Sequence, residues 1–375
     1  MRIAFCTPGS IEFEDYKNYN LLGTEFQVFG LAKELAKKGL EICIIRRWYK
    51  GSVHEELIEN IRVINVASPE FPDLHIQKIA TKMLFSYHMK REISAINPDL
   101  LILTDLFSSY LLCKIDIPKI YITHNPPADL ALDTNRVKLT IKKFVERTVF
   151  RKCQIVISLN RYINKYLNEN GYHSLYIPNA IDIDRYIPNY SDSKYILFGG
   201  RFVKIKKLDI LIRAYYRINN KLMTKYRLIL VGYGPEKEML EKLIKELELG
   251  SRIELIPWLP SDRFIKMISG CTVFLLPSLS ECMPVTVLEA MASGKVVIAS
   301  NIPGPQDIIS SNYDGFLFDN SDIDSLSNYL DMCLSDEGLR RNIGKNARKT
   351  IVEKYSFEVI SNRYISLFES IIGKN

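Results

Sequence analysis

Short apolar runs alternate with helix-like patterns along the whole chain, and this alternation constrains the fold more than any other feature. The runs that predict strands are Ile3–Cys6, Glu41–Ile45, Val63–Val66, Leu100–Leu103, Lys119–Thr123, Ile155–Leu159, Ser174–Ile177, Tyr195–Gly199, Tyr226–Val231, Ile253–Ile256, Thr272–Leu276 and Val296–Ala299. Strands that alternate with helices are typical of βαβ units and parallel sheets. We therefore predict an α/β protein.

The apolar pattern lapses once, from Pro178 to Ser193, where Pro, Asn, Asp, Ser and Tyr predominate. Such a composition is typical of a linker. The 375 residues are enough for two domains that each bury a core. We predict an N-terminal Rossmann-like domain over residues 1–180 and a C-terminal one over residues 194–352. A last helix, within residues 353–375, is predicted to pack back on the N-terminal domain.

Composition excludes several classes of protein. Hydrophobic residues make up 47% and charged residues 25%, as in an average globular chain. No apolar stretch approaches the roughly 20 residues that span a bilayer, and the first residues do not form a signal peptide. The seven cysteines include no C-x-x-C pair, which argues against structural zinc and disulfides. We expect a cytoplasmic protein, and the net charge of +7 gives no argument for nucleic acid.

Two carboxylates, Glu281 and Glu289, follow the predicted strand Thr272–Leu276 and flank the start of a predicted helix. Ligands of open α/β sheets bind at the carboxyl ends of the strands. Free N–H groups at a helix start suit a phosphate. The pattern favours a ligand with a phosphate and many hydroxyls, although each acid could instead lie on a helix surface or interact with the helix dipole.

Two cations, Arg201 and Lys206, follow the glycine turn Gly199–Gly200 after another predicted strand. Such cations can bind a diphosphate and neutralise charge on a leaving group. The alternative is a solvated basic loop, since Lys204 and Lys207 lie there too.

With these motifs in order, the chain resembles the retaining GT-B glycosyltransferases of family 4, the glycosyl transferases group 1. The matching segments are Phe198-Gly-Gly-Arg-Phe-Val-Lys-Ile-Lys206, Leu230-Val-Gly-Tyr-Gly-Pro235, Glu281 to Gly294, Asp314-Gly-Phe-Leu-Phe318, Pro178-Asn-Ala-Ile-Asp182, Tyr355-Ser-Phe357, Gly23-Thr-Glu25 and Thr123-His-Asn125. The resemblance implies a GT-B fold, with two Rossmann-like domains facing across a cleft. Two positions depart from the family: Leu22 and Lys207 stand where it usually has glycine.

The resemblance also implies roles for individual residues. Arg201 and Lys206 would hold the donor diphosphate, Glu289 the ribose, and Glu281 the donor sugar. The residues with an implied catalytic role are His124, Arg201, Lys206 and Glu281. The residues with an implied role in donor binding are Gly23, Gly200, Arg201, Lys206, Gly232, Trp258, Glu281, Met283, Val285, Thr286 and Glu289.

Some of these residues have ordinary alternatives. Gly232 could serve only a tight turn, Trp258 only packing, and His124 only the end of a strand. Glu25 could point into the site or favour the start of its helix. Two Asp-x-Asp triplets, Asp182–Asp184 and Asp322–Asp324, could suggest a metal, but the first lies in the linker motif and the second at a helix start. We expect no metal and no cofactor.

The implied reaction transfers a sugar, with retention, from a UDP- or GDP-sugar to a hydroxyl of a glycan or lipid-linked glycan. Such a reaction serves the biosynthesis of polysaccharides and glycoconjugates. Two alternatives remain. One is a degenerate GT-B protein that binds sugar nucleotides without transfer, and the other is a GT-B epimerase.

Residues 138–152 predict a basic amphipathic helix with a net charge of +5, from six basic residues less Glu146. Its apolar face comprises Ile141, Phe144, Val145, Thr148 and Val149, and its basic face Lys138, Lys142, Lys143, Arg147 and Arg151. Such a helix could lie peripherally on an anionic membrane at the inner face, or its apolar face could pack on the N-terminal core.

Overall fold

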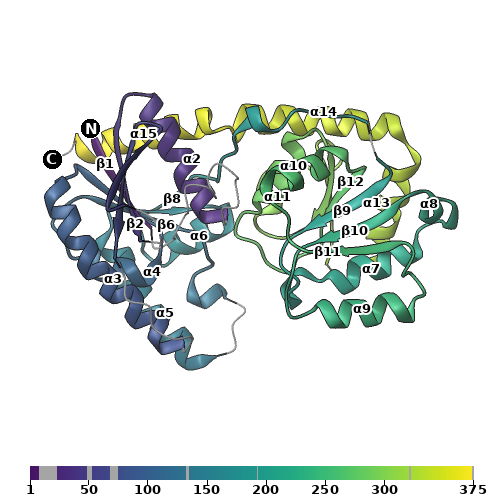
Figure 1. Ribbon diagram of the computed structural model, residues 1–375, viewed down its shortest axis with the longest axis horizontal. Helices are drawn as coiled ribbons and strands as arrows, with labels where there is room; N and C mark the ends of the chain where they lie inside the picture. The colour runs from purple at the N-terminus through teal and green to yellow at the C-terminus, as the bar shows by residue number, and fades with distance from the viewer. Residues whose placement is uncertain are drawn as a thin grey trace. The chain divides into compact units, whose positions relative to one another are not determined.

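The computed structural model describes residues 1–7, 23–48, 53–67, 75–131, 135–191, 193–320 and 322–373. These residues form two compact units (Figure 1). The first unit contains the described residues as far as Ala180 and the last helix from Phe357 onward. The second unit extends from Ile181 to Ser356. The first unit is therefore discontinuous in sequence, since the second lies between its two parts.

The first unit is built on an eight-stranded sheet of order β3-β4-β2-β1-β5-β6-β7-β8. Its strands are β1 (Arg2–Cys6), β2 (Glu41–Arg47), β3 (Glu55–Ile58), β4 (Ile61–Val66), β5 (Leu100–Leu103), β6 (Lys119–Thr123), β7 (Ile155–Ser158) and β8 (Ser174–Tyr176). Every neighbouring pair is parallel except β3 and β4. The apolar runs fold as central strands because both faces of a parallel sheet are covered.

Strand β3 was missed by the sequence pattern because it is an edge strand with two glutamates. It forms a hairpin with β4 through Glu59 and Asn60, which both have positive φ, at 49° and 66°. Two such residues are typical of the tight turn that suits twisted strands. Arg62 pairs with Glu55 across the hairpin at 2.7 Å.

Six helices and one 3-10 turn complete the described part of the first unit. They are α2 (Gly23–Lys37), α3 (His75–Ile96), α4 (Leu106–Leu112), η1 (Ala128–Leu130), α5 (Arg136–Lys152), α6 (Arg161–Glu169) and α15 (Phe357–Ile372). In Figure 1 the last helix, α15, runs beside α2. The phenyl ring of Phe357 fills the space where a Cβ of Gly30 would stand, 2.1 Å away.

The second unit has a six-stranded parallel sheet of order β11-β10-β9-β12-β13-β14. Its strands are β9 (Tyr195–Gly199), β10 (Arg227–Val231), β11 (Ile253–Ile256), β12 (Val273–Leu276), β13 (Val296–Ser300) and β14 (Phe316–Phe318). Its helices are η2 (Ile183–Arg185), η3 (Lys204–Lys206), α7 (Leu208–Arg217), α8 (Asn220–Lys225), α9 (Lys237–Glu246), α10 (Ser261–Gly270), α11 (Val285–Ala292), α12 (Pro305–Ile308), α13 (Ile323–Ser335) and α14 (Glu337–Lys354).

Both sheets have the Rossmann order. Counted within each unit, the parallel strands of the second sheet follow the order 3-2-1-4-5-6, and those of the first follow the same order with one further strand. The direction of the connections reverses between β1 and β5 in the first unit and between β9 and β12 in the second. Ligands bind in such sheets at this reversal point, beyond the carboxyl ends of the strands. The predicted class, α/β with two Rossmann-like domains, is confirmed.

The predicted amphipathic helix exists as α5, but its apolar side chains do not all share one environment. Val145 and Val149 are buried. Ile141 and Phe144 are exposed, at 43% and 61%. At 100° per residue these positions do lie on one side of the helix, within an arc of about 140°. Only the part of this face at Val145 and Val149 packs inward, and the part at Ile141 and Phe144 is exposed. No helix in the described ranges is both long enough and apolar enough to span a membrane.

Candidate functional site

The loops after β9 and β12 carry most of the predicted site residues of the second unit. These two strands are neighbours at the reversal point of the sheet. The turn after β9 contains Gly200 and Arg201 and leads into η3. The loop after β12 contains Glu281 and leads into α11. The fold thus brings together two segments that lie about 80 residues apart in the sequence.

Lys206 and Glu281 form an ion pair between these loops. The Lys206 Nζ lies 2.5 Å from Glu281 Oε1, and both side chains are largely buried, with exposed fractions of 19% and 12%. The Leu279 N–H donates to the Ile205 carbonyl at 2.7 Å, which ties the same two loops through their backbones. A charge-assisted hydrogen bond with little water around it is strong. The ion pair therefore holds both side chains in position before a ligand binds.

Lys207, which departs from the glycine expected at this position, has a left-handed backbone conformation. Its φ and ψ are 49° and 44°, in the left-handed region, directly before α7. Glycine reaches this region without steric cost, so the conformation is one in which a glycine, as the resemblance implies for this position, would be unstrained. The lysine keeps the glycine-like turn at a cost of about 1 kcal/mol.

Arg201 is exposed and differs from Lys206 in having no partner. Within the described ranges its guanidinium makes no hydrogen bond or ion pair with another residue. It therefore presents an uncompensated positive charge beside the Gly200 turn, which suits a phosphate.

Glu289 lies on α11 and accepts a hydrogen bond from the Tyr186 hydroxyl at 2.8 Å. Burial raises the pKa of Glu289 to about 7, although the Tyr186 hydrogen bond and the charge of Arg185 act in the opposite direction. Burial likewise raises the pKa of the Tyr186 phenol well above its usual value. Sequence reasoning missed Tyr186, because this residue lies in the presumed linker, 103 residues from its partner.

The first turn of α11 supplies backbone groups between the two acids. Met283 is buried, while Val285 and Thr286 begin the helix and are partly exposed. The N–H groups of such first residues have no partner within the helix. Pro284, which has no N–H, precedes them at the N-cap. Gly304 packs against the carbonyls of Glu281 and Cys282, where a Cβ would stand 3.1 and 3.0 Å away.

Gly200 and Gly232 allow two loops to touch. A Cβ on Gly232 would lie 1.8 Å from the Gly200 carbonyl oxygen, and the φ of Gly232 is 153°. The Gly232 N–H donates to the Ile256 carbonyl at 2.9 Å. The described contacts therefore give Gly232 a structural reason to be glycine.

Trp258 follows β11 and is 45% exposed. Its ring lies 5.7 Å from that of Phe264, and Phe264 in turn packs where Gly199 has no side chain. An exposed indole of this kind is available to stack on another planar group.

The two Asp-x-Asp triplets lie at helix starts. Asp182 caps η2, where its side chain accepts from the Asp184 N–H at 3.3 Å. Asp322 caps α13 by accepting from the Ser325 N–H at 2.8 Å, as predicted for this residue.

His124 and Gly23 belong to the first unit, so the predicted residues form two groups, one in each unit. Gly23 is the first residue of α2, and Leu22 lies outside the described residues. His124 follows β6, and burial lowers its pKa to about 4. Glu25, on the first turn of α2, has its pKa raised by burial. Both Glu25 Oε2 and His124 Nε2 are buried and have no hydrogen-bond partner in the described structure.

Comparisons with known proteins identify the family to which the chain is similar. Residues 180–350 match the family model of glycosyl transferases group 1, and residues 22–185 match that of Glycosyltransferase Family 4. A UDP-Gal:alpha-D-GlcNAc-diphosphoundecaprenol alpha-1,3-galactosyltransferase of Escherichia coli is 30% identical over 210 residues, which cover 51% of this chain and 54% of that protein. The chain spans between about half and two thirds of the length of the curated relatives that it matches.

Solved structures share the fold over the whole chain. Sucrose-phosphate synthase from Thermosynechococcus elongatus has a TM-score of 0.86 and 19% identity, with 100% of both chains covered. HepE from Anabaena, in complex with UDP-glucose, has a TM-score of 0.76 and 17% identity, with 99% of this chain and 100% of that chain covered. These likenesses concern the fold. The two family models together extend from residue 22 to residue 350, and this chain belongs to the GT-B glycosyltransferases of family 4.

Proposed function

We propose that this protein transfers a sugar, with retention, from a nucleoside diphosphate sugar to an acceptor hydroxyl. The observation that carries the proposal is the set of charged groups at the reversal point of the second sheet. Lys206 and Glu281 form an ion pair there. The Arg201 guanidinium has no partner among the described residues, and Glu289 lies on α11, eight residues after Glu281. Family membership supports the same reaction.

In this proposal Arg201 and Lys206 bind the diphosphate. Cleavage of the bond to the sugar leaves negative charge on the phosphate oxygen, and fixed cations nearby lower the energy of that state. Lys206 is already oriented by Glu281 at 2.5 Å, so little reorganisation is needed when the donor binds. These two cations take the part that a divalent metal ion has in other transferases, and no cofactor is required.

The two acids bind hydroxyl groups in the same proposal. Glu289 accepts hydrogen bonds from the ribose, and Glu281 accepts them from the donor sugar. The first N–H groups of α11, at Val285 and Thr286, point a positive dipole at the phosphate between them. Trp258 contacts the base through its exposed ring.

Retention is proposed to follow a same-face route. The incoming hydroxyl attacks the anomeric carbon on the side from which the diphosphate leaves, and its proton passes to the departing phosphate oxygen. One C–O bond forms as the other breaks, so the charges balance without a protein nucleophile. The enzyme then acts mainly through orientation and electrostatics, with His124 in contact with the donor sugar.

A uridine donor and a lipid-linked glycan acceptor are the substrates that we favour. The galactosyltransferase of Escherichia coli is named for UDP-Gal and for a diphosphoundecaprenol-linked acceptor. HepE was solved with UDP-glucose. A GDP-sugar and a free glycan are the competing substrates. Synthesis of a surface polysaccharide or glycoconjugate would be the cellular setting.

We also propose that α5 contacts an anionic membrane. Val137, Ile141 and Phe144 form one exposed row, with exposed fractions of 71%, 43% and 61%. The exposed basic residues Lys138, Arg147, Arg151 and Lys152 flank this row. The only acid of the helix, Glu146, is buried and accepts from the Ala128 N–H at 2.9 Å. The exposed surface of α5 is thus apolar and cationic, which matches the chemistry of an anionic interface.

The decisive experiment combines nucleotide binding with product analysis. Thermal unfolding with UDP, GDP, ADP and NAD, with and without EDTA, identifies the base and tests the need for a metal. Incubation of the matching sugar nucleotide with an undecaprenyl diphosphate-linked sugar, followed by NMR of the product, reports the anomeric configuration. An α-linked product from an α-linked donor is expected. Nucleotide binding without any transfer would favour the degenerate binding protein, and an isomerised free sugar nucleotide would favour the epimerase.

A further inference from the structure

Hydrogen bonds fix the backbone that follows His124, but one nitrogen of its imidazole ring, Nε2, has no hydrogen-bond partner among the described residues. The Lys142 Nζ donates to the Pro126 carbonyl at 2.6 Å, and Glu146 accepts from Ala128, so α5 fixes the loop that follows His124. The His124 Nε2 is nevertheless buried without a hydrogen-bond partner among the described residues. A buried polar atom of this kind normally has a partner in the protein or an internal water.

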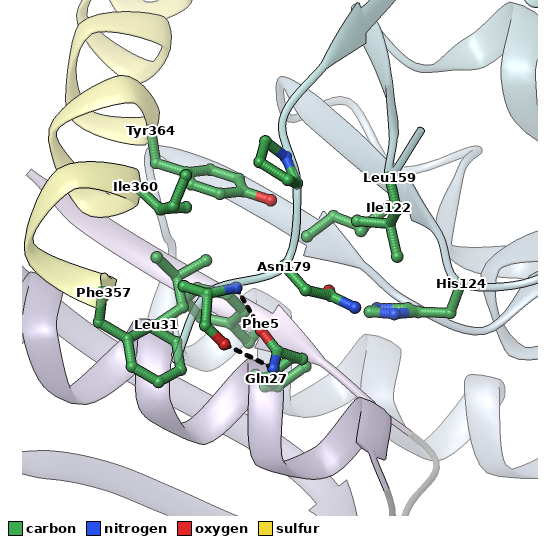
Figure 2. Close-up of a pocket in the computed structure, with 13 residues that line it drawn as sticks. Phe5, Gln27, Leu31, Ile122, His124, Leu159, Asn179, Phe357, Ile360 and Tyr364 are labelled. Atoms are coloured by element: carbon green, nitrogen blue, oxygen red, sulfur yellow. Dashed lines mark hydrogen bonds between the residues drawn. The ribbon is translucent and has the colours of Figure 1, made fainter. Parts of the chain in front are cut away.

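A small cavity lies next to this ring, and Figure 2 shows the residues around it. Its water-accessible volume is about 20 Å³, which is room for a single water. The polar side chains that line it belong to His124, Gln27, Asn179 and Tyr364, and the other side chains around it include Phe5, Ile122 and Leu159. In Figure 2 the carboxamide of Asn179 and the ring of His124 point toward one another.

Asn179 is fixed in this position by its neighbour. The Gln27 side chain donates to the Ala180 carbonyl at 2.8 Å and accepts from the Ala180 N–H at 2.8 Å, so both backbone groups of Ala180 are bound to α2. Asn179 itself is 7% exposed. Ala180 is the last residue of the first unit before the chain enters the second. The end of the connecting segment is therefore anchored beside His124.

We propose that Asn179 is a positioning residue for His124. Its carboxamide N–H, together with one water in the cavity, supplies the hydrogen bond that Nε2 lacks, with Nε2 as acceptor. An amide nitrogen can only donate, so this arrangement requires the proton of the neutral ring to lie on Nδ1. The Nδ1–H is then the donor that His124 offers to a ligand hydroxyl. The part of this inference that concerns sugar transfer rests on the proposed function, whereas the tautomer does not.

The test is long-range ¹H–¹⁵N NMR of the histidines in the full-length protein, with His124→Gln to assign the signal among the five histidines. We expect the Nδ1–H tautomer of His124 and no protonation above about pH 5. Asn179→Asp, which preserves the shape of the side chain, should raise the pKa of His124 by about two units, because a carboxylate stabilises the imidazolium. Asn179→Ala should mix the two tautomers. The exposed Asn170→Ala is the matched control and should leave the His124 signals unchanged.

Kinetics separate the two proposals. Asn179→Ala is expected to lower kcat about tenfold with little change in the KM for the donor, since the ring is present but wrongly oriented. A wild-type Nε2–H tautomer, or His124 signals that do not respond to Asn179→Ala, would overturn the positioning role. Altered His124 signals with an unchanged kcat would support the positioning role and remove His124 from the proposed transfer reaction.

Discussion

The two units share one strand order but treat the polar groups at their sheet edges differently. In the second unit Lys206 is paired with Glu281, and Glu289 with Tyr186. In the first unit Glu25 Oε2 and His124 Nε2 are buried, and the described structure gives them no partner. Buried polar atoms without partners are costly. The difference concerns the predicted site residues, because the second unit also has buried side-chain atoms without a partner in the described structure, among them Ser278 Oγ and Asn320 Oδ1. Glu281 and Glu289 are paired before a ligand binds. His124 Nε2 instead depends on the Asn179 amide and the water proposed above.

The largest effect should come from breaking the pair in the second unit. Lys206→Ala removes a fixed cation and leaves Glu281 without its partner, so kcat/KM for transfer should fall about 10²- to 10³-fold. The measurement is release of nucleoside diphosphate from the donor in the presence of acceptor. The exposed neighbour Lys204 provides the control, because Lys204→Ala changes the net charge equally. Equal activity of the two variants would show that the pair is not needed for the reaction.

The contact between Gly200 and Gly232 tests how rigid the prepared site is. Gly232→Ala would place a Cβ 1.8 Å from the Gly200 carbonyl oxygen and should destabilise the second unit by roughly 3 kcal/mol. Gly250→Ala is the control, since no atom lies within 4 Å of its Cβ position. Thermal unfolding should show a lower midpoint for Gly232→Ala alone. Equal midpoints would mean that the two loops separate easily.

A smaller effect is expected from the pairing of Glu289 with Tyr186. The pKa of Glu289 is about 7, so its carboxylate becomes protonated as the pH falls from about 8 to about 6, and UDP binding should weaken. Tyr186→Phe removes a hydrogen bond that lowers this pKa, so the midpoint should move to higher pH. Calorimetric titration across this range measures both. Glu289→Gln should remove the Glu289-dependent part of the profile, and an unshifted midpoint in Tyr186→Phe would contradict this assignment.

The same carboxyl affects stability with a defined sign. Its folded pKa is raised above the usual 4.5, so its favourable contribution is fully present below that value. This contribution is lost as the pH rises through about 7, because the folded state must then bury a charge. Glu289→Gln should accordingly flatten the pH dependence of the unfolding temperature in this range.

The smallest effect concerns α5 in the first unit. Phe144→Ser should reduce the fraction bound to phosphatidylserine-containing vesicles about fivefold, because it removes a large apolar side chain from the exposed row. Vesicle flotation at low and high salt measures this. Tyr162→Ser is the matched control, since Tyr162 is 54% exposed on α6 of the same unit. Similar losses for both variants, or binding to neutral vesicles alone, would contradict a specific role of α5.

The sequence predicted correctly those features that depend on the residues of a single strand or helix. Buried parallel strands are continuous apolar runs, so Leu100–Leu103 and Val273–Leu276 were recognisable without any partner in view. Edge strand β3 was not, because its glutamates are favourable only next to Arg62 and Arg46. The order of motifs after β9 and β12 located both halves of the ion pair, and the Rossmann topology explains why these loops meet.

What could not be predicted depends on contacts between distant segments. Tyr186 acquires its role from Glu289, and Gln27 from Ala180, 153 residues away. Lys142 illustrates the same limit on a helix. It was assigned to the basic face of the helix, but its Nζ donates to the Pro126 carbonyl. Helical periodicity separates the faces of a helix, and only tertiary packing shows which face turns inward.

The docking of α15 has a consequence for biosynthesis. The first unit needs this helix, because the Phe357 ring fills the notch at Gly30, and Asn362 and Arg363 bind Lys38 and the Tyr176 carbonyl. A ribosome delivers residues in order, so the second unit can fold while the first still waits for its final helix. The first unit, whose synthesis begins first, is therefore the last to complete its folding. A nascent chain stalled before residue 357 would combine a competent second unit with an open apolar groove, which a chaperone can recognise.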